Sequence, residues 1–262
     1  MRAGYFQFSP VFGDIKANVS RAVDAIASVS ADLVVLPELF NTGYQFVSKE
    51  EAGSLAEDVP SGYTTKRLSE LSIKKQMYIV AGIAEKSGDL LYNSAVITGP
   101  QGYMGTYRKT HLFFEEKLWF APGDTGFKVW PTSVGKIGIM ICFDWYFPES
   151  CRTLALRGAQ VIAHPSNLVL PHCPDAMVTR CLENRVHAVT ANRTGLEARG
   201  GKGPLTYIGS SQITSFEGKI IQRASRDSDE IFITEIDPEN AESKDLNQFN
   251  NLFDDRRKDL YE

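Results

Sequence analysis

Short uninterrupted apolar runs constrain the fold of this chain more than any other feature. Leu33–Leu36 and Val161–His164 are the clearest of them, and such runs are typical of strands that are buried on both faces of a sheet. Asn18–Val29 instead carries its apolar residues at helical spacing. Segments of these two kinds alternate along the chain, which predicts an α/β protein in which helices pack in layers on sheets.

The same patterns predict where the other elements lie. We expect helices at residues 18–29, 64–75, 149–156 and 174–185. We expect strands at residues 3–8, 33–36, 78–84, 93–98, 127–130, 136–142, 161–164, 188–192, 210–215, 219–222 and 231–236. Two sheets between two helix layers would accommodate these strands. Because no linker, repeat or low-complexity tract interrupts the pattern, we expect one domain over residues 1–262, ending in an extended polar tail.

The composition argues against several classes of protein. The chain has 262 residues, of which 43% are hydrophobic and 23% charged, and its formal net charge is -4. A balance of this kind is ordinary for a globular protein and offers no basic excess to nucleic acid or an anionic membrane. No stretch has the roughly 20 apolar residues of a membrane helix, and Met1–Pro10 lacks the apolar region of a signal peptide. A cytoplasmic protein is the simplest interpretation.

Glu38 directly follows the buried run Leu33–Leu36, from which only Pro37 separates it. Strand ends in α/β sheets are where ligand sites collect, and an acid among apolar residues is costly to desolvate unless it is paired or functional. Burial of this kind is how proteins make a glutamate into a general base that works near neutral pH. A helix cap or a salt-bridged glutamate is the alternative, and Glu38 taken alone favours that alternative.

Lys109 lies in a basic run between two predicted strands, in the segment Tyr107–Leu112. A lysine near an acid and a developing oxyanion stabilises negative charge as a fixed cation. A surface basic patch is the alternative, and it is favoured in isolation because Arg108-Lys109 is a common kind of pair.

Cys142 ends an apolar strand and precedes a turn into the next helix. Its thiolate would be the competent nucleophile, so we expect a lysine cation to lower the thiol pKa and a glutamate to take the proton. A buried structural cysteine is the alternative. We interpret the other cysteines as structural, with Cys151 and Cys181 in helices and Cys173 in a loop.

Histidine is the usual partner of a nucleophilic cysteine, and the chain has four, His111, His164, His172 and His187. None stands in a recognised Cys–His protease context. His111 could line the site, although a structural hydrogen bond is the favoured role, and His164, at a strand end, is expected to be a satisfied core residue. No cluster of His, Asp and Glu has metal-ligand spacing, so we expect no metal.

Three segments together resemble the nitrilase superfamily of carbon–nitrogen hydrolases. They are Leu36-Pro37-Glu38, then Tyr107-Arg108-Lys109-Thr110-His111-Leu112-Phe113, then Cys142-Phe143-Asp144-Trp145-Tyr146-Phe147-Pro148-Glu149. Any one of them would be a weak signal, but three in the correct order are specific, and the similarity extends over nearly the whole chain. The resemblance implies a four-layer αββα sandwich, pairing of its helices into homodimers or larger homo-oligomers, and no metal or organic cofactor.

The resemblance also implies a mechanism. Glu38 would be the general base, Lys109 the oxyanion-stabilising cation, Cys142 the nucleophile and the amide of Phe143 a second oxyanion donor. Cys142 would attack a carbonyl or nitrile carbon while Glu38 takes the thiol proton, ammonia would leave, and water activated by Glu38 would hydrolyse the thioester to the acid.

The family has a further glutamate after the lysine motif that orients the substrate. Glu115 and Glu116 both lie there, and Glu116, seven residues past Lys109, is preferred. Four further residues are expected to bind substrate, with core packing an equal alternative for each of them: Tyr44, Trp145, Tyr146 and Asn167.

Two departures from the family pattern bear on the substrate. The run Cys142-Phe143-Asp144 replaces the Cys-Trp-Glu of plant and bacterial nitrilases, which favours the amidase and carbamoylase side. Tyr146 stands where relatives that accept acidic amides often carry arginine. The expected substrate is therefore a small neutral or weakly polar amide, with a small aliphatic nitrile as the alternative. An acyltransferase is disfavoured because such relatives carry membrane helices or extra domains, and a non-catalytic binding protein because all three motif residues are intact.

Overall fold

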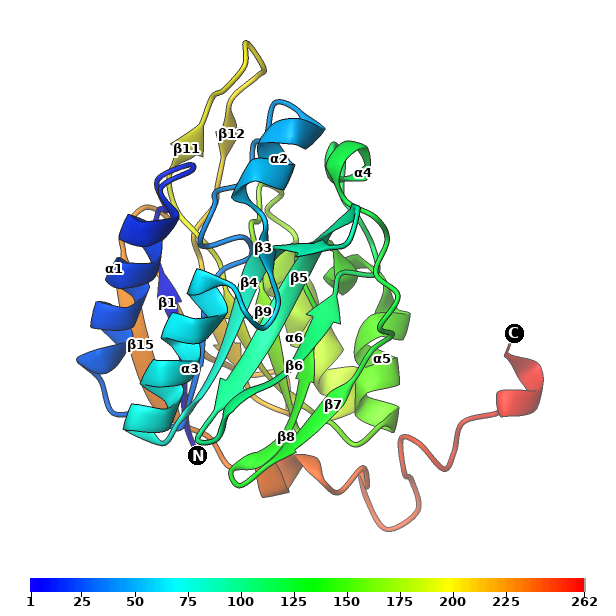
Figure 1. Ribbon diagram of the computed structural model, residues 1–262. Helices are drawn as coiled ribbons and strands as arrows, with labels where there is room; N and C mark the ends of the chain where they lie inside the picture. The colour runs from blue at the N-terminus through cyan, green and yellow to red at the C-terminus, as the bar shows by residue number, and fades with distance from the viewer. Residues whose placement is uncertain (262) are drawn as a thin grey trace.

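The computed structural model describes residues 1–261 and arranges them as layers of helix and sheet (Figure 1). Sheet A consists of β1 (Arg2–Gln7), β2 (Leu33–Val35), β3 (Glu57–Asp58), β4 (Tyr78–Ser87), β5 (Leu90–Gly99), β6 (Gly102–Arg108) and β15 (Glu230–Glu235). Its order is β15-β1-β2-β4-β5-β6, with β3 beside β4. Sheet B consists of β7 (Val129–Thr132), β8 (Gly135–Ile139), β9 (Val161–Pro165), β10 (His187–Ala191), β13 (Gln212–Thr214) and β14 (Ile220–Arg223). Its order is β14-β13-β10-β9-β8-β7.

The sheets face each other, and a pair of helices covers the outer face of each (Figure 1). Helices α1 (Ile15–Ala27) and α3 (Tyr63–Lys75) pack on sheet A. Helices α5 (Pro148–Leu156) and α6 (Cys173–Asn184) pack on sheet B. The predicted four-layer αββα sandwich is therefore confirmed.

Both faces of the central strands are covered, which explains the uninterrupted apolar runs in the sequence. Successive side chains of a strand point to opposite faces. Val35 and Val80 accordingly lie in the core between the two sheets, whereas Val34 and Ile79 lie in the core beneath α1 and α3. A polar residue at any of these positions would be buried.

The parallel strands direct their carboxyl ends to one edge of the sandwich. β1, β2 and β4 are parallel in sheet A, and β8, β9 and β10 are parallel in sheet B. Short elements gather beyond this edge, at the top of Figure 1. They are α2 (Lys49–Leu55), α4 (Glu116–Trp119) and the small hairpin of β11 (Leu196–Glu197) and β12 (Leu205–Thr206).

Several element boundaries differ from the predicted ones. The first helix begins earlier than residue 18 because the Asp14 carboxylate caps it, accepting a hydrogen bond from the Ala17 amide at 3.0 Å. Strand β6 was missed because its two glycines break the apolar pattern. Lys109, predicted to lie in a run between strands, directly follows this strand. Cys173, predicted to lie in a loop, is the first residue of α6.

The last part of the chain leads away from the layers (Figure 1). The 3₁₀ helix η2 (Pro238–Ala241) still packs against β8. The part beyond η2 includes an isolated bridge between Asp245 and Asn251 and the 3₁₀ helix η3 (Lys258–Leu260). Several of its apolar side chains, such as Phe249 and Leu260, are exposed.

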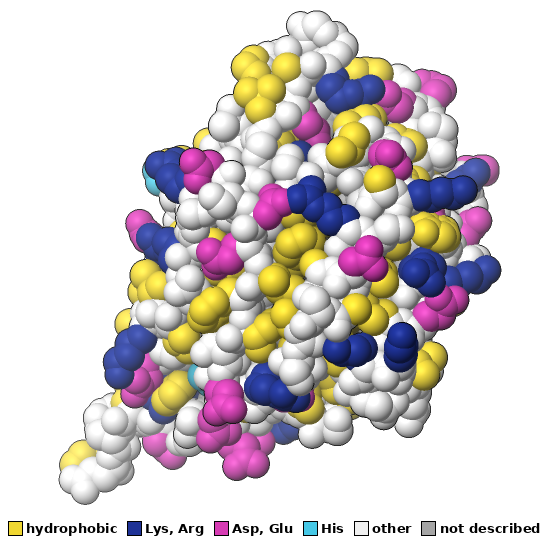
Figure 2. Space-filling model, turned by 90° about the vertical axis from the view of Figure 1, so that its left-hand side faces the viewer, with side chains coloured by type: hydrophobic (Ala, Val, Ile, Leu, Met, Phe, Trp, Pro, Cys, Tyr) yellow, Lys and Arg dark blue, Asp and Glu magenta, His cyan; other side chains and the backbone are white. Residues whose placement is uncertain are grey.

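The surface carries both signs of charge. On the face shown in Figure 2, Lys and Arg side chains are interspersed with Asp and Glu. Within residues 1–261, no helix is both long enough and apolar enough to cross a membrane, and no group of three or more His, Cys, Asp and Glu side chains could hold a metal ion.

Candidate active site

The three motif residues lie just past strand ends and come from both sheets. Glu38 follows β2 and Lys109 follows β6, both in sheet A, while Cys142 follows β8 in sheet B. Because the two sheets are stacked face to face, the site lies where their edges meet. Ligands bind outside the carboxyl ends of parallel strands in many α/β proteins.

A buried ammonium group between two carboxylates forms the centre of the site. Lys109 Nζ donates to Glu38 Oε1 at 2.6 Å and to Glu116 Oε1 and Oε2 at 2.7 and 2.8 Å. All three side chains are almost completely buried. A buried charge is tolerated only when it is paired and hydrogen-bonded. Lys109 pairs with both carboxylates and so offsets their mutual repulsion.

One carboxylate oxygen of Glu38 remains available for proton transfer. Oε1 accepts from Lys109 and from Asn93 Nδ2, the latter at 2.7 Å. Oε2 is buried and has no hydrogen-bond partner among residues 1–261. An ionised carboxylate oxygen is an acceptor, so Oε2 is available to receive a proton.

Two glycines allow close packing of the backbone around these residues. A Cβ at Gly82 in β4 would lie 2.4 Å from the Glu38 Cα, and a Cβ at Gly123 would lie 2.1 Å from the Arg108 carbonyl oxygen. The amide of Gly123 also donates to the Lys109 carbonyl at 2.9 Å. Any side chain at either position would displace a residue of the site.

Cys142 begins the 3₁₀ helix η1 (Cys142–Tyr146) with a backbone φ of 40°. This left-handed conformation is strained for a residue with a side chain, and such strain clusters at functional sites. The Asp144 carboxylate holds the turn, accepting from the Ile141 amide at 2.9 Å and from the Tyr107 hydroxyl at 2.7 Å. Since Tyr107 belongs to β6, Asp144 also connects the two sheets beside the nucleophile.

The thiol is protonated in the resting site. Burial raises the pKa of the Cys142 thiol well above its usual value, the nearby Glu38 raises it further, and Lys109 only partly opposes them. Lys109 lowers the thiol pKa, as expected, but burial and Glu38 outweigh its effect. A nucleophile of this kind depends on a general base at the moment of attack.

The same environment acts on the lysine and on the second glutamate. Burial alone would lower the pKa of Lys109, but Glu116 and Glu38 raise it well above its usual value, so the ammonium stays charged. Burial raises the pKa of Glu116 to about 7, with Lys109 and the Tyr44 hydroxyl opposing the rise. Tyr44 donates to Glu116 Oε1 at 2.7 Å.

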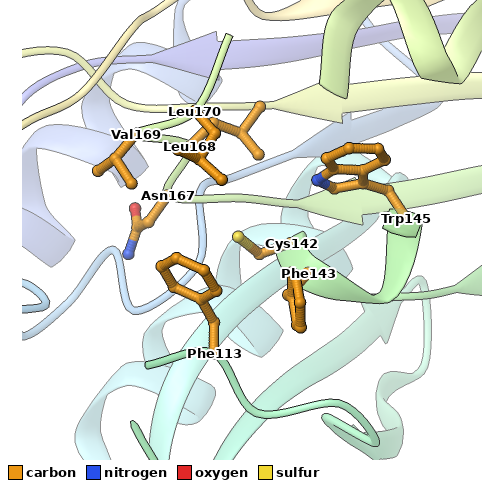
Figure 3. A pocket seen from close by; sticks show the side chains of 8 residues that line it. All are labelled: Phe113, Cys142, Phe143, Trp145, Asn167, Leu168, Val169 and Leu170. Atoms are coloured by element: carbon orange, nitrogen blue, oxygen red, sulfur yellow. The ribbon is translucent and has the colours of Figure 1, made fainter. Parts of the chain in front are cut away.

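A small cavity opens over Cys142, with an empty volume of about 270 Å³ that includes its mouth. In Figure 3, Cys142 lies among the lining residues, with Phe113 and Phe143 on one side and the segment 167–170 on the other. Trp145 and Asn167 also line it. The lining is otherwise apolar and carries no charged side chain within the described chain.

The predicted pocket residues therefore fall into three groups. Trp145 and Asn167 line the cavity, and both polar atoms of the Asn167 amide are buried without a partner in the described chain. Tyr44 is not among the lining residues and donates to Glu116. Tyr146 is 55% exposed, lies outside the lining and packs against Phe143.

The two adjacent glutamates point in different directions. Glu116 faces Lys109, whereas Glu115 pairs with Lys202 at 2.7 Å, in a contact that is partly exposed to solvent. The prediction missed Asn93 and Asp144 as partners of the site. The sequence does not single out Asn93, because its strand also carries the polar residues Ser94 and Thr98.

The profile of the family described as Carbon-nitrogen hydrolase matches residues 2–244. The chain belongs to the carbon-nitrogen hydrolase family. The predicted resemblance to the nitrilase superfamily is thereby confirmed.

The similar carbon-nitrogen hydrolases include both a protein named as a nitrilase and one named as an amidase. The chain is 48% identical to a nitrilase of Pyrococcus abyssi, over 100% of this chain and 99% of the relative. It is 32% identical to the N-carbamoylputrescine amidase of Solanum lycopersicum, over 95% of this chain and 89% of the relative. The crystal structure of a carbon-nitrogen hydrolase from Helicobacter pylori G27 has a TM-score of 0.84 at 30% identity, covering 92% of this chain and 91% of the other.

Proposed function

We propose that this carbon-nitrogen hydrolase converts small neutral amides to carboxylic acid and ammonia through a thioester on Cys142. One observation carries the proposal. The site brings together a protonated thiol, a carboxylate with a free buried oxygen and a buried ammonium group, which are the nucleophile, base and oxyanion partner of acyl transfer.

The first half-reaction transfers the acyl group to the enzyme. Glu38 Oε2 takes the thiol proton as Sγ attacks the carbonyl carbon. The oxyanion is stabilised by the positive charge of Lys109, whose N–H groups are donated to Glu38 and Glu116. It also accepts a hydrogen bond from the Phe143 amide, which is available because the first N–H groups of a helix have no intrahelical partner. Protonated Glu38 then gives its proton to the leaving nitrogen, the C–N bond breaks, and ammonia departs.

The second half-reaction regenerates the free enzyme. Glu38 takes a proton from water as the water oxygen attacks the thioester carbon. The C–S bond breaks, the carboxylic acid leaves, and the thiol recovers its proton from Glu38. Glu116 keeps Lys109 in place through both steps, since it accepts from Nζ with both oxygens.

The cavity lining supports a small uncharged acyl group. It contains no cation to pair with a substrate carboxylate, and Tyr146 lies outside it. The unpaired Asn167 amide would bind one neutral polar group of the substrate.

Small aliphatic nitriles are the second candidate substrates, and the nitrilase of Pyrococcus abyssi supports them. Sγ would add to the nitrile carbon with the same groups in the same roles. Water would then displace ammonia from the thioimidate to give the same thioester.

The test is ammonia release from isobutyramide and isobutyronitrile, two precursors of the same acid. Faster release from the amide supports an amidase, and faster release from the nitrile makes the protein a nitrilase without changing the mechanism. Cys142→Ala should abolish release, whereas Cys151→Ala, which changes a buried cysteine in α5, should retain it. Equal release from Cys142→Ala and wild type would contradict the cysteine mechanism.

We also propose that the protein assembles into homodimers through its α5–α6 layer, with the C-terminal tail crossing to the partner. Exposed apolar side chains on this layer, Leu156 and Leu182, and those of the tail, Leu246, Phe249 and Leu260, support this assembly. The measurement is the molar mass in solution by light scattering, for wild type and for Leu182→Glu. A wild-type mass of one chain would contradict it.

A further inference from the structure

A buried histidine lies directly behind the nucleophile. His164, in β9, is fully buried, and its Nε2 lies 3.0 Å from the carbonyl oxygen of Cys142. His164 does not line the cavity. The sequence indicated only a satisfied core residue at this position.

The partners of the ring fix its tautomer. A carbonyl oxygen can only accept, so Nε2 carries the proton and donates to Cys142. Nδ1 is then an acceptor, and the hydroxyl of Thr190 in β10 donates to it at 3.1 Å. Ser166 Oγ lies 3.2 Å from Nε2 and shares that N–H. Burial lowers the pKa of His164 to about 4, so the ring keeps this neutral form at neutral pH.

The bonded carbonyl belongs to the same peptide unit as the oxyanion donor. The C=O of Cys142 and the N–H of Phe143 lie in one plane and, in a trans peptide, point in opposite directions. A donor that holds the C=O towards His164 therefore directs the N–H away from it. Hydrogen bonds in series also polarise one another, which makes this N–H a better donor.

We propose that His164 is a positioning residue that orients and polarises the Cys142–Phe143 peptide so that its N–H meets the oxyanion. The inference rests on the proposed function, because it requires an acyl-transfer step on Cys142. It also explains what maintains the left-handed backbone of Cys142, at φ 40°, against its strain.

The test compares two replacements of similar size. In His164→Gln the side-chain amide nitrogen takes the place of Nε2 and keeps a donor to the Cys142 carbonyl. In His164→Asn the amide is one bond shorter and lacks that reach. The matched control is His187→Asn in β10, since His187 is also buried and its Nε2 donates to the Asp237 carbonyl, at 3.1 Å.

We expect His164→Asn to lower kcat by about 100-fold with little change in KM, as for the loss of an oxyanion donor. His164→Gln should recover most of that loss, and His187→Asn should keep the wild-type kcat. Thr190→Val, which removes only the Nδ1 partner, should lower kcat in the same direction but less. This milder variant carries the test if His164→Asn does not fold.

Two further measurements separate this role from a merely structural one. Isobutyraldehyde adds to Sγ and places an oxygen where the oxyanion forms, so its inhibition constant should rise in His164→Asn in parallel with the fall in kcat. Alkylation of Cys142 by iodoacetamide displaces iodide and puts no charge on a carbonyl oxygen, so its rate should stay close to wild type.

Three results would each overturn the inference. They are an equal kcat in His164→Asn and His164→Gln, an aldehyde inhibition constant that does not change in His164→Asn, and an alkylation rate that falls as much as kcat. Failure of the proposed function is distinguishable, because then the wild type itself would neither release ammonia nor bind the aldehyde, and the inference would fall with it.

Discussion

Removing the hydroxyl of Tyr44 should shift the acidic limb of the pH–activity profile without removing any group that touches substrate. In Tyr44→Phe, Glu116 Oε1 loses a 2.7 Å hydrogen bond and keeps only its contact with Lys109. That hydroxyl opposes the rise in the pKa of Glu116, which is about 7 in the wild type. Its loss therefore raises this pKa further.

The magnitude follows from the strength of the bond. A hydrogen bond to a charged group contributes about 1.5–3 kcal/mol, and one pKa unit corresponds to about 1.36 kcal/mol. If ionised Glu116 is what holds Lys109, kcat/KM of the wild type falls as pH drops through about 7. In Tyr44→Phe that fall should begin roughly 1–2 pH units higher.

Stability has the opposite dependence on pH. Glu116 has a pKa of about 7 when folded against a model value of 4.5, so between these values the folded chain holds a proton that the unfolded chain has lost. Its contribution to the free energy of unfolding therefore decreases as pH rises across that window. In Tyr44→Phe the decrease should continue to higher pH, and Tm should drop by roughly 3–12 °C.

The assay is kcat/KM from pH 5 to 9, with Tm measured in the same buffers. Tyr207→Phe is the matched control, because Tyr207 is also a buried phenol that donates to a carboxylate, Glu197 Oε2, at 3.3 Å. It should lower Tm and leave the acidic limb in place. An unshifted limb in Tyr44→Phe, with a lowered Tm, would refute the assignment of that limb to Glu116.

Three further expectations concern the charged cluster and the thiol. Lys109→Met should lower the free energy of unfolding by about 3–5 kcal/mol in urea titrations, because it leaves buried carboxylates without a cation. Lys202→Met, which breaks a partly exposed pair with Glu115, should cost about 1 kcal/mol or less; equal losses would contradict this reasoning. Glu116→Gln should abolish ammonia release while Glu115→Gln preserves it, and the reverse result would exchange their roles. Iodoacetamide should add one group per native chain, at Cys142, at a rate that rises with pH because its thiol pKa is raised, and mass spectrometry showing first modification elsewhere would refute this.

The sequence predicted the layers and the strand ends that carry the site, because both follow from local patterns. Glu38 and Cys142 each come just after an apolar run, so their location at a sheet edge could be derived. Lys109 was assigned only through the family motif, since its own strand is rich in glycine and lacks the apolar signal.

The detailed geometry could not be predicted, because it depends on how the two sheets stack. The free oxygen of Glu38 and the raised thiol pKa of Cys142 result from burial among residues distant in sequence. The positive φ of Cys142 has no sequence signal comparable to a glycine. The bond from His164 to its carbonyl requires neighbouring strands to be in register.

Because the base and the nucleophile project from opposite sheets, the reaction rate depends on how side chains pack between those sheets. Side chains such as Tyr5 in β1 and Ile139 in β8 fill the space between those sheets. A change in their bulk would move sulfur relative to oxygen, and a displacement of about 1 Å remote from the chemistry can slow a reaction by roughly 100-fold. A core substitution that hardly changes Tm would then still lower kcat. The reaction rate is therefore a sensitive measure of the distance between the two sheets.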